Sequence, residues 1–215
     1  MIVYGASLSP FVRKVLAYGA EKGLELEHKP LGLGSDDPDF LAASPFRKIP
    51  AFRDGDFGIS DSSAIIHYLE AKYPEPALIP ADPRARARVI WFDEFADTIL
   101  CACGAKMFFN RIVAPRFLGR EGDLEAADQA EKAELPPILD YLERILPENG
   151  WLVGDRLTLA DIAVATAFAN FRHLGIETDS ARHPKVAAFA ERMLARPSFA
   201  GWVEREAAFL EKTAG

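Results

Sequence analysis

The pattern of the chain changes at one proline-rich segment, and this change limits the folds that the chain can adopt. Residues 73–86, YPEPALIPADPRAR, contain four prolines, and proline interrupts both helices and strands. Before this segment short apolar runs alternate with helical periodicity, whereas after it every long pattern is helical. We therefore predict an α+β protein, with a small mixed domain at residues 1–76, a linker at 77–84 and an all-helical domain at 85–215.

The first domain is predicted to have the element order β-α-β-α-β-β-α. MIVYG reads as a buried strand, and a helix follows from Pro10 to about Gly23. Residues 24–31 alternate as a strand does, and the loop at 32–45 has room for one short helix. Two further strands surround a turn at Asp54-Gly55. A helix with apolar residues on one side completes the domain.

The second domain is predicted to contain only helices. One long apolar-periodic segment covers about residues 84–112, and another helix covers about 124–146. Thr158 and Asp161 form a variant of the capping box, and the helix after them, residues 159–171, is apolar nearly all round. This pattern predicts a helix buried at the centre of the domain. A last pair of helices is expected at 186–195 and 198–212.

Composition excludes several classes of function. The chain has 215 residues, of which 49% are apolar, and a net charge of −7, so neither nucleic acid nor an anionic membrane is an expected partner. No apolar run is long enough to span a membrane. The N-terminus lacks a signal-peptide pattern and Cys101 and Cys103 are poor disulfide partners, so a cytoplasmic location is expected. The four histidines are scattered, and no metal is expected.

The turn between the first strand and the first helix contains two serines, Ser7 and Ser9. Ser9 stands where an N-cap belongs, directly before a proline at the first helical position, so a structural role alone explains it. The alternative is functional, because a hydroxyl at a helix N-terminus can donate to an anion that the helix dipole also favours.

The stretch SPFRKIPAF, residues 44–52, also permits two interpretations. It is either a loop that enters a strand with Pro50 at the first position, or a turn with a cis Ile49-Pro50 bond whose backbone can pair with an extended ligand. Arg47 and Lys48 are either solvated surface residues or partners of a ligand carboxylate.

The stretch ISDSSAII, residues 59–66, is a typical helix start. As an alternative it is a second anion site, in which Ser62 donates to a carboxylate and Asp61 accepts from an ammonium group.

Together these motifs resemble the glutathione transferase superfamily. SPFVRKV at the first helix, KIP before the third strand and DSSAI at the next helix occur in that order. The proline-rich linker and the all-helical second domain with its TLAD box follow. The resemblance covers essentially the whole chain, and the joint spacing of the motifs is specific. It implies a thioredoxin-like first domain that binds glutathione, and a homodimer.

The resemblance also implies the catalytic residue. Ser9 falls on the position of the thiol activator in serine-type classes such as tau, and Ser7 is the fallback. Omega-type members carry cysteine at this position, so glutaredoxin-like thiol exchange is not implied. The chain lacks the Ser-Ser-Cys run of the zeta-class isomerases, which disfavours maleylacetoacetate isomerisation.

The glutathione contacts are carried over in the same way. Ile49, which precedes Pro50, is expected to pair with the cysteinyl backbone of glutathione, and Lys48 to contact a carboxylate. Asp61 and Ser62 are expected to hold the γ-glutamyl end. The family more often has glutamate at the position of Asp61.

Physical chemistry accounts for activation by a hydroxyl. A thiol with a pKa near 8.5 is mostly protonated at pH 7, and the thiolate is the nucleophile. Lowering that pKa by about 2 requires roughly 2.7 kcal/mol. A hydrogen bond to a charged group supplies about 1.5–3 kcal/mol, and a helix dipole supplies about 0.3–1 kcal/mol. Ser9 can therefore act without a protein base.

The electrophile is expected against the helical domain, with Met107, Phe108 and Arg111 on the first long helix as candidate walls. Core packing and a surface charge explain these three residues equally well. The predicted function is conjugation of glutathione to small hydrophobic electrophiles. The alternatives are a glutathione-dependent peroxidase, reductase or dehalogenase in the same pocket, or a non-catalytic binding protein of the same fold.

Overall fold

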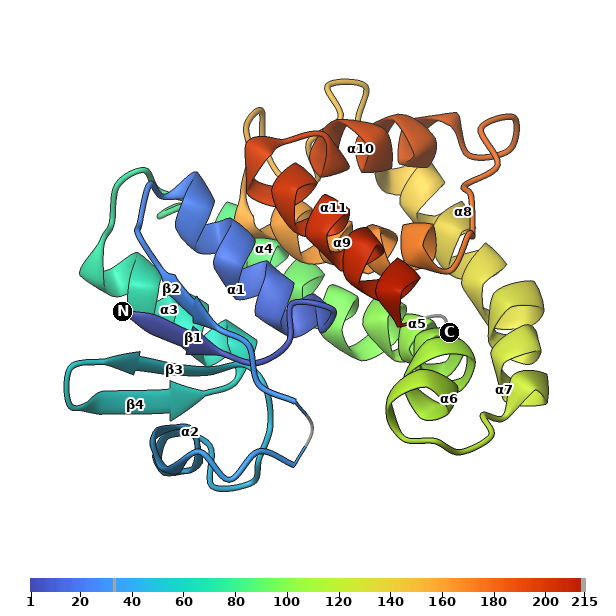
Figure 1. The fold of residues 1–215 in the computed structure, drawn as a ribbon. Helices are drawn as coiled ribbons and strands as arrows, with labels where there is room; N and C mark the ends of the chain where they lie inside the picture. Colours follow the sequence, from blue (N-terminus) through green and yellow to red (C-terminus); the bar gives the residue numbers. More distant parts are fainter. Residues whose placement is uncertain (33, 214–215) are drawn as a thin grey trace.

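The computed structural model describes residues 1–32 and 34–213 and shows a small sheet-containing lobe beside a larger helical one (Figure 1). The sheet has the order β2-β1-β3-β4. β1 (Ile2–Tyr4) runs parallel to β2 (Glu27–Lys29) and antiparallel to β3 (Ala51–Asp54), which pairs antiparallel with β4 (Phe57–Ser60). The predicted order of elements and the thioredoxin-like first domain are confirmed.

The hairpin differs from the prediction by one residue. Asp54 pairs with Phe57 in the ladder, so the two-residue turn consists of Gly55 and Asp56. Gly55 adopts a φ of +64°, which a glycine reaches without a steric penalty.

Three helices cover the two faces of the sheet. α1 (Pro10–Glu21) and α3 (Ser62–Lys72) bury their apolar sides in the main core together with Val3 and Phe52. α2 (Pro38–Ala43) packs on the other face, against Tyr4 and Ala51. This arrangement follows from the alternation of side chains along each strand. It places α1 between the sheet and the helical lobe (Figure 1).

Residues 73–82 carry no helix or strand and join α3 to the helical lobe. The predicted long helix then follows, and it contains two π-helical turns. Its parts are α4 (Pro83–Phe95), η1 (Ala96–Leu100), α5 (Cys101–Phe108), η2 (Phe109–Val113) and α6 (Ala114–Phe117). A second interrupted helix consists of α7 (Leu124–Gln129), η3 (Ala130–Glu134) and α8 (Leu135–Ile145). π-helical turns are frequent at functional sites.

α9 (Leu159–His173) lies at the centre of the helical lobe, with every residue from Leu159 to Phe171 buried. The capping interaction at its start is present. The Asp161 carboxylate accepts hydrogen bonds from the Thr158 backbone at 2.9 Å and from the Thr158 hydroxyl at 3.0 Å. It also accepts from the backbone of Leu152 at 2.9 Å. α10 (Pro184–Leu194) and α11 (Pro197–Lys212) complete the fold.

Buried charges tie the two lobes together. The Lys14 ammonium of α1 is fully buried and lies 2.7 Å from a carboxylate oxygen of both Asp93 and Asp97, on the first long helix. The Ser63 hydroxyl also donates to Asp93, at 2.7 Å. An apolar pattern cannot predict such a cluster. In the described ranges no helix combines the length and apolarity that crossing a bilayer requires.

Candidate functional site

Three loops meet at one end of the sheet because of the strand register. Tyr4, the last residue of β1, pairs with Ala51, the first residue of β3, which in turn pairs with Ser60, the last residue of β4. The loop after β1, the Ile49-Pro50 turn before β3 and the start of α3 after β4 therefore lie side by side. These are the three segments that the sequence motifs single out.

Gly5 lets the first two loops approach closely. Its φ is +129°, and a Cβ atom at this position would lie 2.8 Å from both Ile49 Cβ and Val12 Cγ2. Any larger residue would push Ile49 away from the loop that leads to Ser9. The Ile49-Pro50 peptide bond is cis, which corresponds to the second of the two interpretations of this motif.

Ser9 occupies the N-cap position of α1 but does not act as a cap through its side chain. Its backbone is extended, with φ −70° and ψ 123°, and its hydroxyl makes no capping hydrogen bond. Ser9 instead lines a cavity. Ser7 does not line that cavity. The hydroxyl of Ser9 is thus uncommitted to the helix and stands at the positive end of the helix dipole.

Asp61 and Ser62 start α3 beside the cis-proline turn. Asp61 has a φ of +84°, which is rare for a residue with a side chain, and strain of this kind occurs often at ligand sites. Its carboxylate accepts from the Ala64 backbone at 3.0 Å. Ser62 is buried, and its hydroxyl lies 3.4 Å from an Asp97 oxygen. These residues, like Lys48 and Pro50, lie outside the cavity lining, and Lys48 is exposed.

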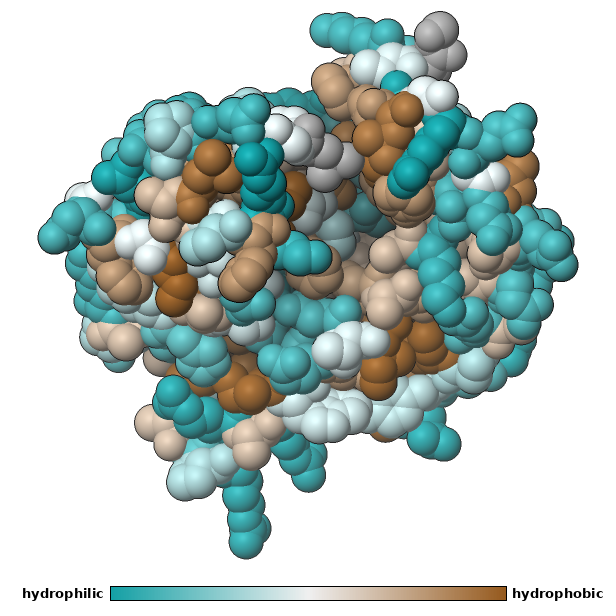
Figure 2. All heavy atoms as spheres, turned by 90° about the horizontal axis from the view of Figure 1, so that it is seen from below, coloured by the Kyte–Doolittle hydropathy of each residue, from teal (hydrophilic) through white to brown (hydrophobic). Residues whose placement is uncertain are grey.

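A cavity of about 590 Å³ lies between the two lobes. Figure 2 shows the molecule hollowed in this region. Ser9 and Ile49 line it from the first domain, and Ser9 and Asn170 are among the lining residues that have polar side chains. None of the described residues that line it carries a charge. Its apolar walls include Phe11, Phe108, Phe109, Phe117, Leu118 and Phe209.

Of the three candidate wall residues only Phe108 lines the cavity. Met107 is fully buried in the core, and Arg111 points to η3 and α7, where it pairs with Glu131 and, at 2.8 Å, with Asp128. Successive helical residues point about 100° apart, so Met107 and Phe108 face different surroundings. The π-helical turn η2 changes the helical repeat at Arg111.

Sequence reasoning missed the contribution of the last helix. Phe209 of α11 stacks on Phe117 of α6, with ring centroids 5.7 Å apart and an interplanar angle of 10°. The Arg116 guanidinium donates to the Leu210 carbonyl at 3.0 Å. Nothing in the local pattern of residues 197–212 indicates that this helix reaches a site formed by the first domain.

Cys101 also lines the cavity, and neither it nor Cys103 forms a disulfide. Burial raises the pKa of the Cys101 thiol to about 12, and the nearby Asp97 carboxylate adds to the effect. The thiol therefore stays protonated at neutral pH and is no competing nucleophile. Within the described part of the chain, no three His, Cys, Asp or Glu residues are grouped so that they could hold a metal ion.

Comparison with known proteins relates this architecture to one family. Residues 3–77 match the family model described as glutathione S-transferase, N-terminal domain, and residues 110–206 match the model of the C-terminal domain. The chain is 35% identical over 204 residues to glutathione S-transferase 3 of Zea mays, covering 92% of this chain and 90% of that protein. It is also 30% identical over 203 residues to a maleylacetoacetate isomerase of Pseudomonas aeruginosa, covering 91% of each.

A solved structure has the same fold and a bound ligand. It is a glutathione S-transferase from Methylobacterium radiotolerans in complex with glutathione sulfonate, 30% identical, with a TM-score of 0.77. The match covers 94% of this chain and 93% of that one. The meeting of the three loops beside an apolar cavity and these similarities along the whole chain lead to one conclusion: the protein belongs to the glutathione S-transferase superfamily.

Proposed function

We propose that the protein is a glutathione transferase in which Ser9 stabilises the glutathione thiolate for attack on a small hydrophobic electrophile. The observation that carries this proposal is Ser9 itself, which lines an apolar cavity at a helix N-terminus and whose side chain makes no capping hydrogen bond. A hydroxyl and a helix dipole both favour an anion at this point. The solved relative bound to glutathione sulfonate supports the choice of ligand.

One set of residues, at the end of the sheet, binds glutathione. Glutathione lies along the end of the sheet, with its cysteinyl backbone at Ile49 and its γ-glutamyl end at Asp61 and Ser62. Lys48 is exposed beside this edge and provides a cation for a carboxylate. The thiol loses its proton to solvent, and the Ser9 hydroxyl donates a hydrogen bond to the resulting thiolate.

The cavity binds the electrophile. Its uncharged walls favour a neutral apolar molecule, and Phe108 and the aromatic pair Phe117–Phe209 form much of the contact surface. The thiolate sulfur forms a bond to the electrophilic carbon, and the leaving group departs with the bonding electron pair. The glutathionyl group thus replaces the leaving group on the electrophile, which is a transferase reaction.

Conjugation of glutathione to an activated aryl halide tests the proposal, with wild type, Ser9→Ala and the control Ser7→Ala. Loss of one hydrogen bond to a charged group, about 1.5–3 kcal/mol, is expected to lower kcat about 10- to 100-fold in Ser9→Ala. Ser7→Ala is expected to keep wild-type kcat, because Ser7 does not line the cavity. Equal rates in wild type and Ser9→Ala would remove Ser9 from its role.

The same preparation separates the alternative reactions. Analysis of the products after incubation with glutathione and a hydroperoxide, or with an aliphatic halide, distinguishes peroxidase and dehalogenase activity from conjugation. A non-catalytic binding protein would show no turnover with any of them.

The cytoplasm is the proposed location, and the two unpaired cysteines agree with a reducing compartment.

The proposal includes a homodimer. Phe46, in the loop before β3, is 87% exposed, which is unusual for a large apolar side chain. A separate apolar groove of about 300 Å³ is lined by Trp91, Phe95, Ile99, Pro137, Ile138 and Tyr141. Two apolar features on one chain suit a twofold pair, in which each copy covers the other. Sedimentation equilibrium is expected to give a dimer for wild type and a weakened dimer for Phe46→Ser.

A further inference from the structure

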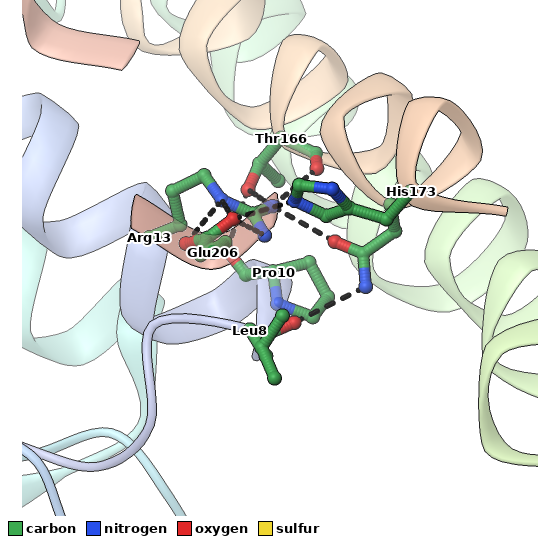
Figure 3. A network of polar contacts seen from close by, with 7 residues as sticks. Leu8, Pro10, Arg13, Thr166, His173 and Glu206 are labelled. Carbon is green, nitrogen blue, oxygen red and sulfur yellow. Dashed lines mark hydrogen bonds and ion pairs between the residues drawn. The ribbon is translucent and has the colours of Figure 1, made fainter. Parts of the chain in front are cut away.

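A buried polar network joins α1, α9 and α11 (Figure 3). The fully buried Arg13 guanidinium donates to the Glu206 carboxylate at 2.7–3.1 Å. Its remaining Nη1 group donates to the Thr166 carbonyl and to Asn170 Oδ1, both at 2.8 Å. His173 Nε2 lies 2.9 Å from Glu206 Oε2.

The other end of this network holds the backbone on both sides of Ser9. The Thr166 hydroxyl donates to the Pro10 carbonyl at 2.7 Å, and the Asn170 amide nitrogen donates to the Leu8 carbonyl at 3.1 Å. Leu8 and Pro10 are the immediate neighbours of Ser9. The Ser9 side chain makes no capping bond, and its own backbone bonds, to Ala6 and Arg13 at 3.0 Å, lie within the first domain, so these two contacts are what join the Ser9 turn to α9.

Arg13 also determines how Asn170 is oriented. An asparagine amide has one acceptor and two donors, and Arg13 can only donate, so it fixes the Asn170 oxygen toward α1. The amide nitrogen is then left to face Leu8. Glu206 in turn balances the charge of Arg13. Burial raises the pKa of Glu206, but Arg13 and His173 outweigh it, so the pKa falls below its ordinary value and the group stays ionised.

Such a network is not needed for stability alone. Removing two charges from water costs several kcal/mol each, and an apolar core of the same volume is often equally stable. What an ion pair with further directed hydrogen bonds provides is a defined geometry. The network imposes this geometry on the backbone of Leu8 and Pro10, on either side of Ser9, the residue proposed to stabilise the thiolate.

We propose that Arg13, Thr166, Asn170 and Glu206 are positioning residues for Ser9, which hold its hydroxyl in line with the glutathione sulfur by fixing the carbonyls of Leu8 and Pro10. This inference rests on the proposed function. It gives the helical domain a role in activating the thiol, in addition to lining the cavity. The hydrogen bond to a thiolate depends on distance and direction. A loosened Ser9 therefore leaves the thiol with a higher pKa, while the electrophile cavity keeps its walls.

Two variants test the network without removing a cavity residue. Thr166→Val removes only the hydroxyl that contacts Pro10, and Glu206→Gln removes the charge that pairs with Arg13. The readouts are the pKa of the bound glutathione thiol, followed by thiolate absorbance, and kcat and KM for an aryl halide. Both variants are expected to raise the thiol pKa by about 1 and, through the smaller thiolate fraction, to lower kcat about fivefold at pH 6.5, with the KM of the electrophile unchanged.

The chain offers a matched control at the opposite end of the same two helices. Glu21 of α1 accepts from Arg196 at 2.7 and 2.8 Å and from Ser198, so it also joins α1 to the start of α11. Glu21→Gln is expected to lower the unfolding midpoint but to leave the thiol pKa and kcat at wild-type values. Thr166→Ser keeps the hydroxyl and is expected to restore the thiol pKa.

Wild-type thiol pKa values in both Thr166→Val and Glu206→Gln would overturn the inference. Where Glu206→Gln fails to fold, the comparison of Thr166→Val with Thr166→Ser decides. Ser9→Ala keeps the two proposals apart. If Ser9→Ala leaves the thiol pKa unchanged, the proposed function fails. If Ser9→Ala raises it and the network variants do not, only the positioning role fails.

Discussion

Replacement of Gly5 by alanine tests whether the approach of two loops builds the glutathione site. The new methyl group would stand 2.8 Å from both Ile49 Cβ and Val12 Cγ2, in a backbone conformation with φ +129°. A side chain at positive φ costs about 1–2 kcal/mol. Overpacking costs about 1–3 kcal/mol more, so Gly5→Ala is expected to lower the free energy of unfolding by about 2–5 kcal/mol.

Gly154→Ala is the matched control, because Gly154 has a φ of +75° and its added Cβ would meet no atom within 4 Å. Urea unfolding of the two variants separates the steric cost of the new methyl group from the cost of a side chain at positive φ. Titration with glutathione then measures whether the site still binds it. Gly5→Ala is also expected to raise the KM for glutathione, because Ile49 must move, and to change the KM of the electrophile less. The reasoning is refuted if Gly5→Ala costs no more stability than Gly154→Ala and binds glutathione equally well.

Three further predictions concern other parts of the chain. Burial raises the pKa of Asp161 to about 6, above its unfolded value near 3.9, so the folded state binds the extra proton between these values. The contribution of Asp161 to the free energy of unfolding therefore falls as pH rises from about 4 to 6, by roughly 3 kcal/mol in total. Asp161→Asn is expected to flatten this pH dependence, measured by urea unfolding across the same range. Phe108→Ala is expected to raise the KM of a hydrophobic electrophile severalfold with little change for glutathione, whereas Arg111→Gln, which loses contacts to Asp128 and Glu131 only, keeps both KM values in steady-state kinetics. Lys14→Met leaves the carboxylates of Asp93 and Asp97 without their cation and is expected to destabilise the fold by about 3–5 kcal/mol, read from the unfolding midpoint.

Much of the fold could be predicted from local patterns because those patterns reflect burial directly. The all-round apolar character of residues 159–171 corresponds to the buried helix α9, and the spacing of Thr158 and Asp161 corresponds to its capped start. The proline-rich segment separates the two kinds of structure. The three loop motifs come together because strand register brings their flanking residues into line.

The details of the site depend on contacts that no local pattern contains. Ser9 has the sequence of a helix cap, yet its side chain makes no capping bond, and Thr166 and Asn170, more than 150 residues away, contact the backbone on both sides of it. Arg13 looks like a surface charge on an amphipathic helix, but α9 and α11 bury it. The π-helical turn η2 separates Phe108, at the cavity, from Arg111, which faces away.

The most direct test of the account is the pKa of the glutathione thiol in the complex, measured for wild type and Ser9→Ala by titrating the thiolate absorbance. We expect a wild-type pKa about 2 below that of a free thiol, near 6.5, and a return toward 8.5 in Ser9→Ala. A bound thiol whose pKa equals that of free glutathione, or one that does not change when the Ser9 hydroxyl is removed, would contradict it.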